Sequence, residues 1–206
     1  MFIVLGLTEK IKSSKRIIQR YKTEEELRDI FKVDRLRRVA RKLLVFRVVG
    51  EPAKWYLVSF DLKQVKKKKG GYRIPTKEYS IIKDVAYWNM CARVDNSTYV
   101  CPPDGVEEVE TKIKEYTEYV EVYPVEPHDE KTTDYLMERL SETIMYIITQ
   151  LLMQAEKIEK TGHPRAIAKG IEMLKKLEKL LEKYKIPGFI NAGNRLKEAI
   201  EAHKKE

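Results

Sequence analysis

The sequence lacks the short motifs that mark most nucleotide-driven and hydrolytic enzymes. Its 206 residues contain no GxxxxGKS or GxxxxGKT, GxGxxG, GxSxG or HExxH pattern, so neither a phosphate loop, nor a nucleophile elbow, nor a helical zinc site is indicated. Histidine is scarce, and its three residues stand in unrelated segments, so we expect surface side chains at His128, His163 and His203. We expect no metal, no cofactor and no enzymatic activity.

Cysteine is also scarce, with only Cys91 and Cys101 present. Their spacing is not the CxxC of zinc sites or thioredoxin-like motifs. The surrounding sequence, residues 86–101, predicts two strands around a turn at Asn96, because the residue types there tolerate tight turns. Cross-strand pairing makes a disulfide geometrically possible, and credible inside a hyperthermophile. Two buried, reduced thiols are the interpretation that we prefer, because a disulfide is improbable in an ordinary cytosol.

Long hydrophobic runs are missing as well. The longest, residues 144–153, is interrupted by Thr149 and Gln150 and reaches about half of a membrane span. The apolar residues 2–5 have no basic region before them and no cleavage site after them, so no signal peptide is expected. We therefore expect a cytoplasmic protein without membrane contact.

Charge is abundant and unevenly distributed. Charged residues make up 35% of the chain, Lys and Glu dominate and Gln is scarce, which favours a thermophilic, archaeal or viral source. Residues 1–80 contain 22 basic and 9 acidic residues, an excess of 13, whereas the rest contains 19 basic and 23 acidic residues. This asymmetry suits DNA or RNA as a partner. A solvated basic surface is the alternative.

The first 60 residues predict a strand or apolar anchor, three helices and a hairpin. The strand or anchor covers residues 1–8, and a basic helix follows over residues 9–21. Thr23 and Glu26 form a capping box for the second helix, and Asp34 caps the third. Apolar residues of that third helix are Leu36, Val39, Leu43 and Leu44. The β-prone residues 45–49 and 55–60 flank Gly50-Glu51-Pro52 and predict the hairpin.

This order resembles a winged helix-turn-helix over residues 10–62, in TEEELRDIFKVDRLRRVARKLL followed by FRVVGEPAKWYLVSF. The turn departs from the family, since Lys32-Val33-Asp34 replaces the usual small residue or Gly. The resemblance implies a third helix in the major groove. We predict nucleic-acid contacts there at Arg35, Arg37, Arg38, Arg41 and Lys42, and elsewhere at Lys54, Lys66, Lys67, Lys68, Lys69 and Arg73. A charged helix face that is merely solvated is the alternative.

A second resemblance covers residues 54–126. The run WYLVSFDL, the hairpin CARVDNSTYVCP, a helix near residues 106–119 and the strand YVEVYPV resemble the ferredoxin-like domain of PaaX-type repressors, ChrB-type proteins and the small subunit of the CRISPR spacer integrase. In that family an Asp after the first strand can mark a metal-dependent nuclease, and Asp61 matches this position. One carboxylate does not make a metal site. Residues 55–60 are a wing strand in one resemblance and a sheet strand in the other.

Aromatic residues interleave with basic residues in the middle of the chain. These are Tyr72, Tyr79, Tyr87, Trp88 and Tyr99. Such side chains can stack on unpaired bases, although packing within the fold is the interpretation that we prefer.

Beyond Thr133 the chain is expected to be helical. Apolar spacings of three and four form one stripe, Gly162 ends the first helix, and Pro164 begins the next. Pro187-Gly188 ends the second helix and leaves a short terminal one. This helical hairpin docks on the body or on a second copy, and a homodimer or a larger assembly through it would place two basic helices on one duplex.

Together these features predict an α+β protein with three parts. Residues 1–52 form a basic, winged-helix-like part, residues 53–127 a small ferredoxin-like mixed sheet, and residues 128–206 the helical hairpin. The predicted function is nucleic-acid binding, with DNA and a regulatory role preferred. The alternatives are a structural or adaptor subunit of a ribonucleoprotein, defence or viral assembly, and a metal-dependent nuclease that uses Asp61.

Overall fold

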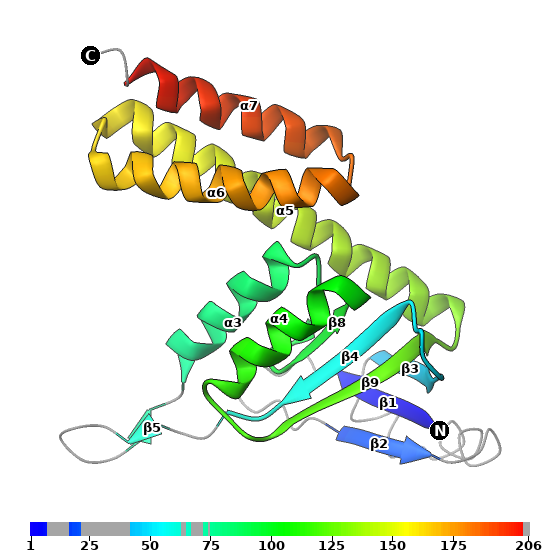
Figure 1. Cartoon of the computed structure of the whole chain (residues 1–206). Helices are drawn as coiled ribbons and strands as arrows, with labels where there is room; N and C mark the ends of the chain where they lie inside the picture. The colour runs from blue at the N-terminus through cyan, green and yellow to red at the C-terminus, as the bar shows by residue number, and fades with distance from the viewer. Residues whose placement is uncertain (8–16, 22–41, 63–64, 67–71, 74, 204–206) are drawn as a thin grey trace.

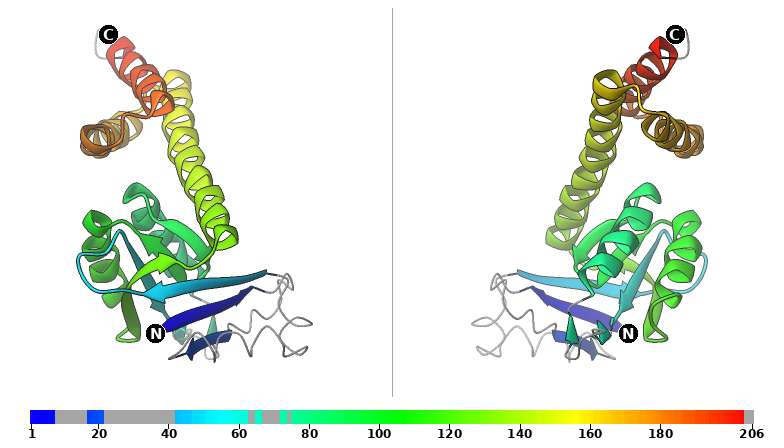
Figure 2. Two further views of the ribbon diagram at one scale, coloured as in Figure 1. Left: turned by 90° about the vertical axis from the view of Figure 1, so that its right-hand side faces the viewer. Right: turned by 90° about the vertical axis from the view of Figure 1, so that its left-hand side faces the viewer.

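The chain folds as an antiparallel β-sheet with helices on both faces, which confirms the predicted α+β class (Figure 1). Two helices cover one face, and one long helix crosses the other face and continues to two further helices (Figure 2). The structure is a computed structural model (Figure 1), and it describes residues 1–7, 17–21, 42–62, 65–66, 72–73 and 75–203.

The sheet has seven strands in the order β2-β1-β3-β9-β4-β8-β7, and all neighbours are antiparallel. Its strands are β1 (Phe2–Leu7), β2 (Ile17–Tyr21), β3 (Lys42–Val48), β4 (Trp55–Phe60), β7 (Ala92–Asp95), β8 (Thr98–Cys101) and β9 (Val120–Pro127). A separate two-stranded ladder joins β5 (Val65–Lys66) to β6 (Tyr72–Arg73). Strands from both sides of residue 52 therefore take part in one sheet.

The predicted hairpin of residues 45–49 and 55–60 is wrong. Both segments are strands, but β9 lies between them, so that Val48 and Trp55 each pair with Val125. The eight-residue strand β9 offers a hydrogen-bonding edge on each side, and both strands use it instead of pairing with each other. The sequence Gly50-Glu51-Pro52 predicted a reversal of chain direction, but β3 and β4 run in the same direction, because both are antiparallel to β9.

Three helix and strand boundaries also differ from the prediction. Residues 17–21 are strand β2 rather than the end of a helix, because they pair with β1. Lys42, Leu43 and Leu44 belong to β3 rather than to the third helix, because they also pair with β1. Residues 86–88 are the last turn of α3 rather than a strand. In the first two cases, pairing with β1 determines the structure, although the spacing of the apolar residues is that of a helix.

Helices α3 (Thr76–Trp88) and α4 (Pro103–Lys114) pack on one face of the sheet. Side chains alternate along the central strands, so that Val58, Tyr99 and Cys101 face these helices. Gly105 lets α4 begin against the end of α3, since a Cβ on it would lie 2.6 Å from the backbone oxygen of Asn89. Helix α3 was not predicted from the sequence.

The opposite face of the sheet is covered by the first half of α5 (Glu130–Thr161). Asp129 caps this helix by accepting a hydrogen bond from the backbone N–H of Thr132 at 2.7 Å. Tyr135 and Leu136 pack on the sheet, and the second half of the helix continues beyond it as a stalk (Figure 2).

The second half of α5 packs against α6 (Pro164–Lys183) and α7 (Pro187–Ala202). The predicted end at Gly162 is confirmed, with φ of 55° there, and Pro164 begins α6 as expected. Pro187 is the first residue of α7, which confirms the predicted terminal helix after the helical hairpin. No helix in the described ranges is long and apolar enough to span a membrane.

Candidate functional site

The predicted nucleic-acid contacts fall mainly where the structure gives no description. Arg35, Arg37, Arg38, Arg41 and Lys67–Lys69 lie outside the described residues. Lys42 begins β3, Lys66 ends β5, and Arg73 ends β6. Lys54 lies just before β4 with an exposed side chain.

The strand directions locate the points from which the basic segments leave the sheet. Strands β3 and β4 are parallel to each other, because each is antiparallel to β9. Segment 22–41 enters β3 at Lys42, whereas the β5–β6 ladder follows the end of β4 at Phe60. Since Val48 and Trp55 are level with each other, these two points lie roughly 35 Å apart along the strands. Segment 22–41 leaves the sheet at Tyr21, however, which is level with Arg47 because both pair with Phe2. Of its two attachment points, only Lys42 therefore lies at the end of the sheet remote from Phe60.

Seven basic side chains in the second half of the chain form described ion pairs with carboxylates. Described pairs there are Lys112–Glu115, Lys114–Glu110, Arg139–Glu142, Lys160–Glu156, Lys176–Glu172, Lys183–Asp104 and Arg195–Glu159. Most join residues three or four apart on one helix, or neighbouring elements. These pairs compensate part of the positive charge locally, and residues 81–206 as a whole carry a small acidic excess.

Asp61 directly follows β4 and is exposed, and its backbone N–H donates to the oxygen of Tyr119 at 3.1 Å. Within the described ranges, no group of three or more His, Cys, Asp or Glu side chains could hold a metal ion. A catalytic role for Asp61 stays a prediction. His128 and His163 are at least partly exposed, and His163 caps α6 by accepting from the backbone N–H of Arg165.

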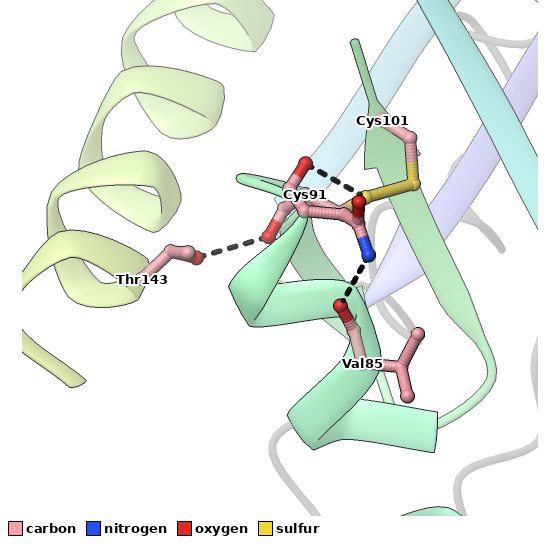
Figure 3. Close-up of a disulfide and its surroundings, with 5 residues drawn as sticks. Val85, Cys91, Cys101 and Thr143 are labelled. Atoms are coloured by element: carbon pink, nitrogen blue, oxygen red, sulfur yellow. Dashed lines mark hydrogen bonds between the residues drawn. A yellow bond between two sulfur atoms is a disulfide. The ribbon is translucent and has the colours of Figure 1, made fainter. Parts of the chain in front are cut away.

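Cys91 and Cys101 form a disulfide between the start of β7 and the end of β8 (Figure 3). Both residues are fully buried, and the predicted hairpin around Asn96 is present, with Ala92 opposite Val100. The hydroxyl of Thr143 on α5 donates to the backbone oxygen of Cys91 at 3.0 Å. The disulfide and its neighbours therefore connect three elements: the hairpin of β7 and β8, the end of α3, and α5.

The central aromatic side chains pack inside the fold. Tyr99 is fully buried and stacks on Phe60 with ring centroids 6.1 Å apart, and Tyr87 meets Tyr146 edge to face at 4.8 Å. Tyr79 is half-buried against Phe60. Base stacking is thus excluded for Tyr99 and Tyr87, which confirms the preferred interpretation for them.

The hydroxyl of Tyr99 is buried and has no hydrogen-bond partner among the residues that the structure describes, and burial raises its pKa. An unsatisfied buried hydroxyl costs about 1–3 kcal/mol. We expect Tyr99→Phe to leave the free energy of unfolding unchanged or to raise it by about 1 kcal/mol in urea titration. Tyr135→Phe is the control, because the Tyr135 hydroxyl donates to Val94 at 3.3 Å, and its loss should lower stability by about 1 kcal/mol. Equal losses in both variants would refute this account.

A cleft of about 590 Å³ lies between α3, α4, α5 and α6, and sequence analysis missed it because α3 was missed. Lys183 crosses it to Asp104 at 2.5 Å, which raises the pKa of Lys183. The Tyr146 hydroxyl donates to Asp84 at 2.5 Å. Four lysines and four carboxylates line the cleft, namely Lys169, Lys176, Lys179, Lys183, Asp84, Asp104, Glu108 and Glu172. With no net charge, it is not a site for a polyanion.

Comparison with known proteins gives no relative: no protein-family model, no curated protein and no solved structure matches the chain. Function is therefore inferred from the charges and contacts of the chain itself. The feature with the clearest chemical meaning is the uncompensated positive charge of residues 1–80.

Proposed function

We propose that the chain binds nucleic acid, preferably DNA in a regulatory role, through the basic residues of its first two fifths. The observation that carries this proposal is the separation of charge. Residues 1–80 hold 13 more basic than acidic residues, and the rest of the chain offers an acidic excess of only 4. Neutralisation inside the molecule is therefore incomplete, and phosphate groups supply the missing negative charge with release of counterions.

The order of elements supports a ferredoxin-like assignment for residues 54–126. Apart from the β5–β6 ladder inserted after β4, the chain runs β4-α3-β7-β8-α4-β9, and these strands lie side by side as β9-β4-β8-β7. This is the βαββαβ order of ferredoxin-like domains, which the repressor-type proteins named above share. The sheet face opposite α3 and α4 is packed under α5, so contacts from loops and termini suit the proposal better than bases stacked on an open sheet.

A salt titration of duplex binding tests this proposal. We expect the logarithm of the association constant to fall linearly with the logarithm of salt concentration, with a slope of about −0.9 for each phosphate contacted. Reversing the charge of Arg37, Arg38 and Arg41 to Glu should make the slope shallower by about 3, because each arginine that no longer meets a phosphate reduces it by about 1. Fluorescence anisotropy of a labelled duplex provides the measurement.

A matched control carries the same change in net charge elsewhere. Lys175→Glu, Lys185→Glu and Lys197→Glu change exposed side chains on or beside α6 and α7. If both triple variants lose affinity equally, only net charge matters and no interface exists in the basic part. If the wild-type chain shows no salt-dependent binding but co-purifies with a defined protein partner, the adaptor hypothesis replaces this one.

A further inference from the structure

The outer side of α5 carries apolar side chains that are exposed and do not belong to the hydrophobic core. Met137, Met145, Leu152 and Met153 are 47%, 59%, 44% and 58% exposed. Residues 143–155 of this helix contain no charged residue, although 35% of the chain is charged. The inner side explains only part of this composition, because it needs apolar residues at alternate spacings of three and four.

The exposed residues form a narrow strip in the middle of the stalk. Met145, Thr149, Leu152 and Met153, which we call the α5 strip, are three or four residues apart and therefore share one side of the helix. The buried residues Ile147, Leu151 and Ala155 of the same turns face α6 and α7. Figure 2 shows this part of α5 between the sheet and the α6–α7 pair.

We propose that the α5 strip is the interface of a homodimer, in which two copies of α5 pack antiparallel about a two-fold axis at Thr149. Thr149 is the midpoint of the uncharged segment 143–155. A two-fold rotation about an axis there places segment 143–155 of one copy antiparallel to the same segment of the other copy. Met145 of one copy then meets Met153 of the other. A two-fold contact of this kind uses the same patch twice and is closed, which is the commonest symmetry of soluble oligomers.

The charges that flank the uncharged segment favour the antiparallel direction. With the axis at Thr149, exposed Glu138 of one copy lies opposite exposed Lys160 of the other. In a parallel pair, each charged residue would instead lie opposite the same residue of the other copy, and the like charges would repel each other. Glu142 and Glu156 also approach each other in the antiparallel pair, but each is already paired within its helix, with Arg139 and Lys160 respectively.

A dimer of this kind requires a long contact along α5. From residue 138 to residue 160 the helix is about 33 Å long, at 1.5 Å per residue. A dimer of this kind needs to bury about 1,200 Å² over both copies, the lower limit of specific interfaces, so the contact has to extend along this whole length. The proposal does not depend on nucleic-acid binding, although two copies would bring two basic segments to one ligand.

Disulfide trapping tests the position of the axis. The native cysteines are both engaged in the buried disulfide, so Thr149→Cys supplies one reactive thiol. Under mild oxidation we expect it to form covalent dimers roughly ten-fold faster or more than Lys175→Cys on α6, because contact raises the effective thiol concentration. In a mixture of Met145→Cys and Met153→Cys proteins, the mixed dimer should form faster than either homodimer.

Sedimentation equilibrium provides the second arm. The double variant Met145→Glu and Leu152→Glu should be monomeric at concentrations where the wild type is dimeric, and its melting temperature at low concentration should equal that of the wild type, since both side chains are exposed. A monomeric wild type, together with equal trapping rates for Thr149→Cys and Lys175→Cys, would overturn the dimer. The salt titration of duplex binding is unaffected by that outcome, so the two proposals fail separately.

Discussion

Removal of the Cys91–Cys101 disulfide is expected to lower the melting temperature by about 5–10 °C. The disulfide closes a short loop, with a sequence separation of 10. Loss of a cross-link over a loop of this size costs about 2–3 kcal/mol in the chain-entropy account, and each kcal/mol corresponds to about 2–4 °C for a chain of about 200 residues. Scanning calorimetry of the Cys91→Ala and Cys101→Ala double variant gives the measurement.

Alanine is the suitable replacement because both positions are fully buried, and a serine hydroxyl there would add its own desolvation cost. The control is the double variant with and without reductant, whose melting temperature should not change. The wild type treated with reductant in denaturant and refolded should approach the double variant. An unchanged melting temperature in the double variant would show that the cross-link contributes nothing to stability.

The second large effect is expected at the start of α7. Phe189 is fully buried in the cluster formed by α5, α6 and α7, whereas its neighbour Ile190 is exposed. We expect Phe189→Ala to lower the free energy of unfolding by about 3–5 kcal/mol, since it removes a large apolar side chain and leaves a cavity. Urea denaturation followed by circular dichroism measures this change.

Ile190→Ala is the matched control for this helix. It removes apolar atoms from the next residue, but the surrounding water fills the space, so a change below about 0.5 kcal/mol is expected. If the two variants lose similar stability, burial of Phe189 does not determine the effect, and the packing of α7 on α5 is not what stabilises the cluster.

Local signals made the C-terminal helices and the hairpin of β7 and β8 predictable. The apolar stripe of α5 repeats within one helix, and Gly162 and Pro164 end and begin helices through their own backbone properties. The turn at Asn96 likewise depends on adjacent residues. Helix α3 was missed because only three of its positions are buried, Ile82, Ala86 and Tyr87, and its last residues are aromatic and β-prone.

Strand order could not be predicted in the same way. Nothing in residues 45–60 indicates that their partner is β9, more than 60 residues later in the chain. Pairing between distant segments depends on packing of the whole sheet against α5 and on strand directions. For the same reason, charge counting identified the basic part of the chain, but the attachment of segment 22–41 between β2 and β3, and of the β5–β6 ladder after β4, emerged only from the structure.

The central place of β9 has a consequence for synthesis of the protein. Strands β3 and β4 leave the ribosome first, yet neither has its shared neighbour until residue 127 has been made. At about 5–20 residues per second, the interval between residues 60 and 127 lasts roughly 3–13 s. During this time two apolar strands present open edges to the surrounding solution. An open strand edge can pair with other chains, so insertion of β9 is the step that removes this hazard and closes the sheet.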